Sequence, residues 1–232
     1  MSMIKTTNLT KSYGRARGIT DLTLHVPAGS CFGFIGPNGA GKSTTIRTLL
    51  GLIAPTAGRA EVLGLDCVRD RTAILAQVGY MPSEAMFYPE MRSGEVIRLS
   101  ADLRKKDCRR EAAGLLEALD LDPRKKIREL SLGNRKKVSI VCAMQHRPAL
   151  YVLDEPTSGL DPLVQRAFWS LLEERRREGA AVFLSSHVLY EVQRYCDRAA
   201  IIREGRLVAE GATAELDIEN KFFDYYEGRI TT

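Results

Sequence analysis

The sequence predicts an α/β fold: a mixed β-sheet with an inserted α-helical lobe. Short apolar segments typical of buried strands alternate with helical segments at Leu150–Leu153, Ala181–Leu184 and Ala199–Ile202. Alternation of this kind indicates a mostly parallel sheet. Between about residues 84 and 145 the apolar spacing is instead that of helices. The 232 residues suffice for one large domain, or for two lobes that share a core.

The N-terminal part predicts further strands, which we expect to pair antiparallel and so make the sheet mixed. Met3–Leu9 alternates weakly between apolar and polar residues, and Lys11–Gly14 is expected to end that strand. Apolar and polar residues alternate again over Leu22–Val26, which favours one half-buried strand. Arg203–Arg206 reads as the turn of a hairpin near the C-terminus.

Composition is that of a soluble globular protein, with 44% hydrophobic and 27% charged residues. No apolar run approaches the roughly 20 residues that a transmembrane helix needs. The N-terminus lacks the pattern of a signal peptide, so we expect a cytoplasmic location, or one on the inner face of the membrane through a partner. The five cysteines are scattered and never spaced as C-x-x-C, which indicates free buried thiols rather than disulfides or a zinc site.

The net charge of +5 raises the question of a nucleic-acid partner. Acidic residues stand beside most of the basic clusters, so we interpret these clusters as solvated helix faces and expect no nucleic-acid binding. The clusters are Arg104–Lys106 with Arg109 and Arg110, Arg124–Lys126, Arg135–Lys137 and Arg175–Arg177.

A phosphate-binding motif stands between an apolar strand, Cys31–Ile35, and a helical segment, Ser43–Leu52. Its residues, Gly36 to Ser43, fit G-x-x-x-x-G-K-[ST] at every fixed position, which predicts a P-loop NTPase. The glycines let backbone N–H groups point at phosphate oxygens, and the helix dipole adds to the attraction. Lys42 is expected to reach the β- and γ-phosphates, and Ser43 to bind Mg²⁺. The residues predicted to bind ATP here are Gly36, Asn38, Gly39, Ala40, Gly41, Lys42, Ser43 and Thr44.

Two acidic residues, Asp154 and Glu155, follow the apolar strand Leu150–Leu153. Ligands of parallel sheets bind at the carboxyl ends of the strands, where these side chains would lie. Asp154 is predicted to hold the Mg²⁺ ion. Glu155 is predicted to position or deprotonate the attacking water. By itself the pair could equally cap the start of a helix, but next to a phosphate-binding loop the catalytic interpretation is favoured.

Over nearly its whole length the sequence resembles the nucleotide-binding domain of ATP-binding cassette (ABC) transporters. Leu130–Asn134 resembles the signature L-S-G-G-Q, and Ser158–Asp161 resembles the D-loop. His187 resembles the switch histidine, and Tyr13 resembles the aromatic residue that stacks on adenine. The resemblance implies one ABC domain over residues 1–232, with an ATP-binding core near 1–83 and 146–232 and a helical lobe near 84–145.

The resemblance also implies that two such domains enclose ATP between them. Ser131, Gly133 and Asn134 would then contact the γ-phosphate bound by another subunit, with Asp161 close by. His187 would hydrogen-bond the γ-phosphate or the attacking water, acting in catalysis with Glu155 and Lys42. The other two histidines, His25 and His146, have no such context and are expected to be structural.

Two departures from the family pattern stand out. In the signature, Leu132 replaces the first glycine, and Asn134 replaces the glutamine. After the strand Val78–Met81, Ser83 stands where the family's Q-loop carries a glutamine, and Glu84 follows it. A serine side chain is too short for the usual contact with magnesium and water.

The function implied is that of an ATP-hydrolysing subunit working with separate transmembrane permease subunits and a second nucleotide-binding domain, in an exporter more than an importer. The alternative is a soluble ABC-type ATPase that acts on ribosomes or DNA. Such proteins usually carry two cassettes or a long coiled coil, and the segment between Ser43 and Ser131 has room for neither. An apolar cluster of Met86, Phe87, Tyr88 and Met91 either docks a partner's helix or packs the lobe.

Overall fold

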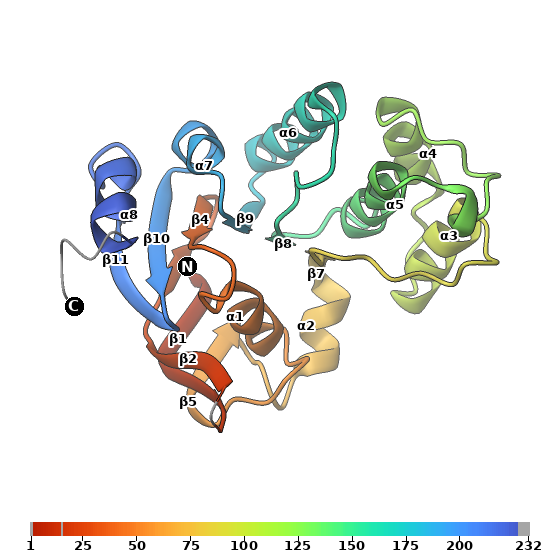
Figure 1. Ribbon diagram of the computed structural model, residues 1–232. Helices are drawn as coiled ribbons and strands as arrows, with labels where there is room; N and C mark the ends of the chain where they lie inside the picture. Colours follow the sequence, from red (N-terminus) through yellow and green to blue (C-terminus); the bar gives the residue numbers. More distant parts are fainter. Residues whose placement is uncertain (1, 15, 227–232) are drawn as a thin grey trace.

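The computed structural model describes residues 2–14 and 16–226, in which two β-sheets are covered and separated by helices (Figure 1). The larger sheet is parallel except at one edge, where β10 and β11 form an antiparallel hairpin. Its strands, in spatial order, are β11 (Arg206–Ala212), β10 (Arg198–Arg203), β4 (Cys31–Ile35), β9 (Ala181–Ser186), β8 (Leu150–Asp154) and β7 (Val78–Met81).

The smaller sheet is antiparallel and contains the N-terminal strands. The α/β fold with a mixed sheet is confirmed in the larger sheet, whereas the N-terminal antiparallel strands form a sheet of their own. Its strands, in spatial order, are β2 (Ala16–Leu22), β1 (Ser2–Tyr13), β5 (Ala57–Val62) and β6 (Leu65–Asp66), with β3 (His25–Pro27) also pairing with β1.

Two predictions about the N-terminal strands were wrong. Strand β1 does not end at Lys11 but continues to Tyr13, because it pairs with β2 up to that residue. The single strand expected over residues 22–26 is interrupted after Leu22. There the Thr6 hydroxyl accepts the Leu24 N–H at 2.9 Å and donates to the Leu22 carbonyl at 2.8 Å, while the Thr6 N–H donates to the Leu24 carbonyl at 2.9 Å.

Helices lie on both faces of the larger sheet (Figure 1). Helices α6 (Pro162–Arg177), α7 (Leu189–Tyr195) and α8 (Ile218–Tyr226) lie on one face. On the other face are α1 (Lys42–Leu49), which lies between the two sheets, and α2 (Arg71–Gln77). The buried side chains around α1 form one apolar cluster with both sheets, including Ile46, Phe34 and Leu9.

The segment with helical spacing contains α3 (Ser93–Leu103), α4 (Arg109–Ala118), a short 3₁₀ turn (Ile127–Glu129) and α5 (Leu132–Met144), beyond the β7 edge of the larger sheet (Figure 1). Its buried apolar residues are continuous with those between the sheet and α6. The lobe therefore shares a core with the sheet, and the boundaries given above for core and lobe stay a prediction.

The basic clusters pair largely with neighbouring acids, for example Arg109 with Asp107 at 2.7 Å and Arg124 with Asp122 at 3.0 Å. The interpretation as solvated faces is nevertheless wrong for three of their members. Lys136, Lys137 and Arg175 are buried, because each lies on a helix face that packs inward.

All five cysteines are free, and only Cys142 among them is partly exposed. Cys31 Sγ lies 3.5 Å from Cys196 Sγ. No helix in residues 2–14 and 16–226 is both long and apolar enough to cross a bilayer.

Candidate ATP-binding and hydrolysis site

The loop after β4 curls into a cradle that ends at the first turn of α1. Gly41 is the N-cap of α1 with φ of 110°, a conformation that L side chains rarely adopt. A Cβ on Gly36 would lie only 2.6 Å from the carbonyl oxygen of Ile202 in β10. Only glycine therefore fits at this position, where the loop passes close to β10. Helix α1 begins at Lys42, and its N-terminus therefore faces the cradle, as an anion site requires.

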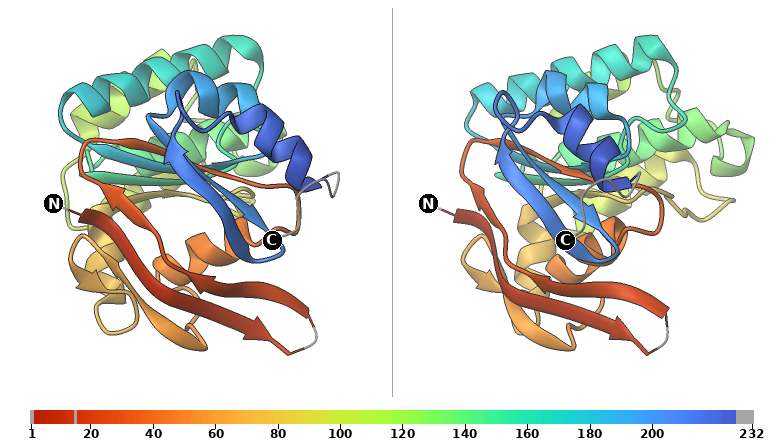
Figure 2. Two further views of the ribbon diagram at one scale, coloured as in Figure 1. Left: turned by 90° about the vertical axis from the view of Figure 1, so that its left-hand side faces the viewer. Right: turned by 60° about the vertical axis from the view of Figure 1, so that its left-hand side comes forward.

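A hairpin far along the sequence supports the cradle from behind. At the tip of the predicted β10–β11 hairpin, Gly205 donates its N–H to the Ala40 carbonyl at 2.9 Å. The Gly205 carbonyl in turn accepts the Thr20 N–H from β2 at 2.8 Å. Figure 2 shows this hairpin, in blue, reaching from the larger sheet to the N-terminal strands.

Strand register brings the other predicted groups to the same edge of the sheet. Ile35, the last residue before the cradle, pairs with Ser186, which precedes His187. Asp154 pairs with Ser185 on the other side of β9. Because these strands are parallel, their carboxyl ends meet at one edge. The cradle, the acidic pair and His187 are therefore neighbours.

The space between these groups is a pocket of about 400 Å³. It is lined by the cradle together with Ser83 from the loop after β7 and Glu155 from the loop after β8. The cradle residues that line it are Pro37, Asn38, Gly39, Gly41, Lys42, Ser43 and Thr44.

Glu155 connects the two other predicted catalytic residues. Its Oε1 lies 3.0 Å from Lys42 Nζ, and its Oε2 lies 2.7 Å from His187 Nδ1. Lys42 also donates to the carbonyls of Gly36 and Pro37, at 2.5 and 3.2 Å. The structure thus brings Lys42, Glu155 and His187 together at the pocket. A phosphate bound in the cradle would compete with Glu155 for the Lys42 ammonium.

Asp154 is buried, and its two oxygens have different surroundings. Oδ1 accepts a 2.5 Å hydrogen bond from Ser185 Oγ. Oδ2 is buried and has no hydrogen-bond partner within the described chain. A buried carboxylate oxygen without a donor suits a cation ligand. The described residues contain no cluster of three or more His, Cys, Asp or Glu that could hold a metal by themselves. A magnesium ion here would therefore be coordinated by nucleotide phosphate oxygens as well as by protein side chains, as Mg²⁺ usually is.

Comparison with known proteins decides the family. The family model of the ABC transporter matches residues 19–158 of the chain. The chain belongs to the ABC transporter family. It is an ATP-binding and ATP-hydrolysing cassette of that family.

This ABC cassette has relatives of the transporter type. It is 38% identical to the bacitracin transport ATP-binding protein of Bacillus licheniformis, over 90% of this chain and 69% of that protein. It is 35% identical to a Nod factor export ATP-binding protein of Paraburkholderia xenovorans, over 89% and 69%. A solved ATP-binding subunit of an ABC transporter superposes with a TM-score of 0.86 and 31% identity, over 99% of this chain and 95% of that one.

The predicted signature residues of the cassette do not line its own pocket. Ser131 is exposed and is the N-cap of α5, where its Oγ accepts the Asn134 N–H at 3.2 Å. Gly133 lies beside Gly159 of the D-loop, whose carbonyl oxygen would be 3.2 Å from a Cβ on Gly133. Asp161 is the N-cap of α6, accepting two N–H groups at 3.0 Å. Signature and D-loop thus lie beside each other, and none of their predicted residues lines the pocket.

Tyr13, predicted to stack on adenine, lies at the end of β1 beside its turn with β2. Its side chain is 45% exposed, and Lys11 Nζ is 5.2 Å from the ring centroid. The ring does not line the 400 Å³ pocket. Its contact with the base therefore stays a prediction.

Sequence reasoning missed three groups that shape the site: Ser185, Gly205 and Lys136. Ser185 Oγ donates to Asp154 and, at 3.2 Å, accepts the Glu155 N–H. Lys136 Nζ is 2.6 Å from the Glu155 carbonyl oxygen. The only sequence signal for Ser185 was its place two residues before His187, at the end of an apolar strand.

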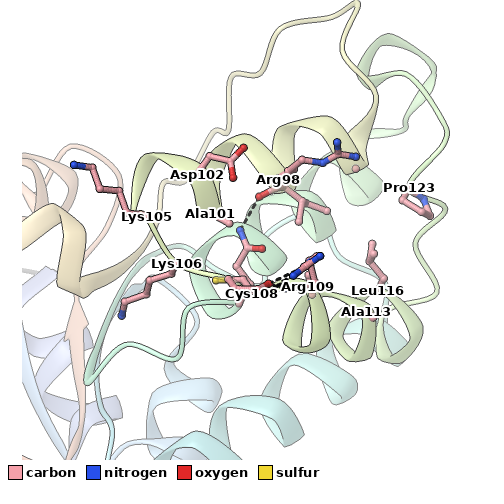
Figure 3. A pocket seen from close by; sticks show the side chains of 15 residues that line it. Arg98, Ala101, Asp102, Lys105, Lys106, Cys108, Arg109, Ala113, Leu116 and Pro123 are labelled. Carbon is pink, nitrogen blue, oxygen red and sulfur yellow. Dashed lines mark hydrogen bonds and ion pairs between the residues drawn. The ribbon is translucent and has the colours of Figure 1, made fainter.

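A separate pocket of about 680 Å³ lies in the helical lobe, between α3 and α4 (Figure 3). Apolar residues such as Ile97, Ala101 and Leu116 line it. Charged side chains, among them Arg98 and Lys105, lie around it (Figure 3). None of the predicted ATP-site residues lines this pocket, so its size has no bearing on nucleotide binding.

Proposed function

We propose that this cassette drives export through separate transmembrane subunits. It binds ATP with Mg²⁺ at an interface with a second cassette, which is either another copy of itself or a related chain. The carrying observation is that Lys42, Glu155 and His187 meet at the pocket, whereas Ser131 is exposed elsewhere on the chain. The names of its relatives, which refer to transport and export, support export as the direction of transport. Attachment to transmembrane subunits would place it at the inner face of the membrane.

Phosphate binding falls to the cradle and to Lys42, whose ammonium leaves Glu155 for the more highly charged phosphates. The Ser43 hydroxyl and Asp154 Oδ2 would hold Mg²⁺ beside the phosphates. When bound, Mg²⁺ neutralises charge on the phosphate oxygens. Ser185 keeps Asp154 oriented for this role by fixing its other oxygen.

Glu155 then has the position of a general base. With Lys42 engaged by phosphate, the carboxylate remains beside the pocket, still hydrogen-bonded to His187 through Oε2. Its Oε1 is free to accept a proton from water that attacks the γ-phosphate. His187 orients the carboxylate and is close enough to contact either the water or the phosphate.

The signature of a second chain would close the site. The N-terminus of α5 presents backbone N–H groups beside the exposed Ser131, where an approaching phosphate would meet them. Leu132, at 63% exposed, would be buried when a second chain covers this surface.

A mixing experiment tests the composite site. Lys42→Ala should lose ATP binding at its own cradle, and Ser131→Arg should block the signature surface. Each variant alone should be inactive, but a mixture restores one intact site per heterodimer. Steady-state phosphate release should therefore recover to about a quarter of the wild-type rate, from random pairing and one active site in two. A mixture as inactive as its components would contradict a shared site.

Transmembrane subunits would dock in the groove between the core and the lobe, which the sequence marked by its apolar cluster. The structure divides that cluster. Phe87 and Met91 pack against the core, whereas Met86 and Tyr88 are 93% and 71% exposed. Leu103 of α3, 76% exposed, lines the same groove of about 290 Å³. An apolar groove with exposed side chains at its rim suits an amphipathic helix of a partner.

Paired substitutions separate docking from packing. Met86→Asp and Tyr88→Asp should leave the melting temperature and basal ATPase unchanged but release the cassette from the membrane fraction of its own cell. Phe87→Asp should lower the melting temperature, because Phe87 packs against the core. Retention of both exposed-site variants in the membrane fraction would contradict docking at this groove.

A further inference from the structure

Lys136 places a buried ammonium group between two loops of the ATP site. It lies in α5 of the helical lobe and is only 6% exposed. Its Nζ donates a 2.6 Å hydrogen bond to the carbonyl of Glu155, in the loop after β8. The same Nζ is 3.5 Å from the carbonyl of Ser83, in the loop after β7. One cation therefore connects the lobe to both loops.

The surroundings of Lys136 partly offset the cost of burying its ammonium. Burial lowers the pKa of its ammonium, and the nearby carboxylates of Glu155, Asp154 and Glu191 oppose that effect. Burying a lysine is costly unless carbonyls and opposite charges replace the lost water. Here both carbonyls and two of the three carboxylates, those of Glu155 and Asp154, belong to the candidate hydrolysis site itself.

Lys137, the next residue, contacts a different part of the molecule. It is also buried, at 8% exposed, but its Nζ lies 3.4 Å from the Asp120 carbonyl at the end of α4. Two adjacent lysines of one helix thus differ chiefly in what they face. Lys136 faces the ATP site, and Lys137 faces the interior of the lobe.

The residue that Lys136 holds is conformationally unusual. Glu155 has φ of 50°, which is unfavourable for a residue with a Cβ. Its peptide groups are fixed on both sides. Its N–H donates to the Ser185 carbonyl and hydroxyl, each at 3.2 Å, and its carbonyl accepts from Lys136. Without Lys136 the Glu155 carbonyl would keep only the longer hydrogen bond from the Ser158 N–H, at 3.4 Å. The residue could then relax away from the geometry that directs its carboxylate to Lys42 and His187.

Lys136 also approaches the backbone of Ser83, in the loop after β7. The serine side chain lines the pocket but is too short to reach across it. Lys136 approaches one backbone carbonyl in the loop after β7 and one in the loop after β8, and so connects the two loops without the Ser83 side chain.

We propose that Lys136 is a positioning residue, which holds the Glu155 and Ser83 loops together and transmits movements of the helical lobe to Glu155. The proposal rests on the proposed role of Glu155 as the base. It predicts that Lys136 affects the rate of hydrolysis and not the affinity for ATP, because its ammonium contacts the loops and not the phosphate cradle.

The test compares Lys136→Met with Lys137→Met, two variants that remove a buried ammonium from the same helix. Lys136→Met should lower kcat by roughly tenfold or more while KM and nucleotide affinity stay within about twofold. Lys137→Met should keep the wild-type kcat. Lys136→Arg, which retains the charge and the donors, should recover much of the lost rate. If Lys136→Met does not fold, Lys136→Gln replaces it, with the same expectation.

A double variant separates this proposal from the role of Glu155. In single-turnover measurements, Lys136→Met should cause no further loss in a Glu155→Gln background, because it acts through Glu155. Full additivity there would overturn the proposal, as would wild-type kcat in Lys136→Met or an equal loss in Lys137→Met. If wild type hydrolyses ATP and Glu155→Gln hydrolyses it equally well, the role of Glu155 is wrong instead, and the proposal that depends on it is overturned too.

Discussion

His187 Nδ1 lies 2.7 Å from Glu155 Oε2, although the two residues are 32 positions apart in the sequence. They meet because β8 and β9 are parallel neighbours and both residues follow the ends of these strands. The imidazole is 49% exposed, whereas the Glu155 side chain is only 15% exposed. The contact therefore joins a largely buried carboxylate to an exposed imidazole.

Removing the imidazole should slow hydrolysis without weakening nucleotide binding. We expect His187→Ala to lower kcat by roughly 100-fold, the usual size of an acid–base or orienting contribution. ATP affinity, measured with a fluorescent nucleotide, should be unchanged, because the cradle binds through backbone groups and Lys42. His25→Ala is the matched control, since His25 is exposed on β3 in the other sheet. An equal loss in both variants would remove His187 from the site.

Ser83→Gln restores a longer side chain at the pocket wall. We expect kcat to rise by roughly fivefold, about 1 kcal/mol in activation free energy, and the magnesium dependence to tighten. Glu84→Ala should change little, because Glu84 is exposed and does not line the pocket. Steady-state ATPase rates measured against magnesium concentration for wild type and both variants show which of the two positions affects the reaction. Collapse of activity in Glu84→Ala, with no effect of Ser83→Gln, would show that Glu84 has the role assigned to the Ser83 position.

Acid should destabilise the fold through His146. This histidine is buried, its Nε2 is 3.3 Å from the Val78 carbonyl, and burial lowers its pKa from 6.5 to about 4. Between those values the unfolded chain binds a proton that the folded chain does not. The free energy of unfolding therefore falls with decreasing pH across that window, by about 3 kcal/mol for this group.

Urea unfolding at pH 7 and pH 4 measures this effect. His146→Gln, which keeps a donor for the Val78 carbonyl but cannot ionise, should lose less stability on acidification than wild type. Identical pH dependence in the two proteins would show that His146 titrates normally in the folded state.

The sequence predicted the site best where the chemistry is local. Gly36 to Ser43 form the cradle and α1 starts at Lys42, because the glycines and the strand–helix context are contained in one short segment. Strand ends carrying Asp154 and His187 were also predictable, since apolar runs that stop at polar residues mark the edge of a parallel sheet.

Features that depend on tertiary packing were not predictable in this way. Lys136 and Lys137 stand in a basic run that looks like a solvated helix face, and only the packing of α5 shows that they are buried. The break in the strand over residues 22–26 arises from the hydroxyl of Thr6, which lies 16 positions before Leu22 in the sequence. No periodicity in either segment carries that information.

The role of Glu155 as the general base in ATP hydrolysis is tested most directly by measuring phosphate release from purified wild type and Glu155→Gln with Mg²⁺ and ATP. The substitution keeps the size of the side chain and its contact with His187 but removes the base. We predict that ATP still binds, that turnover falls by at least roughly 100-fold, and that the variant accumulates as an ATP-bound dimer in size-exclusion chromatography. Wild-type turnover in Glu155→Gln would contradict the assignment of Glu155 as the base.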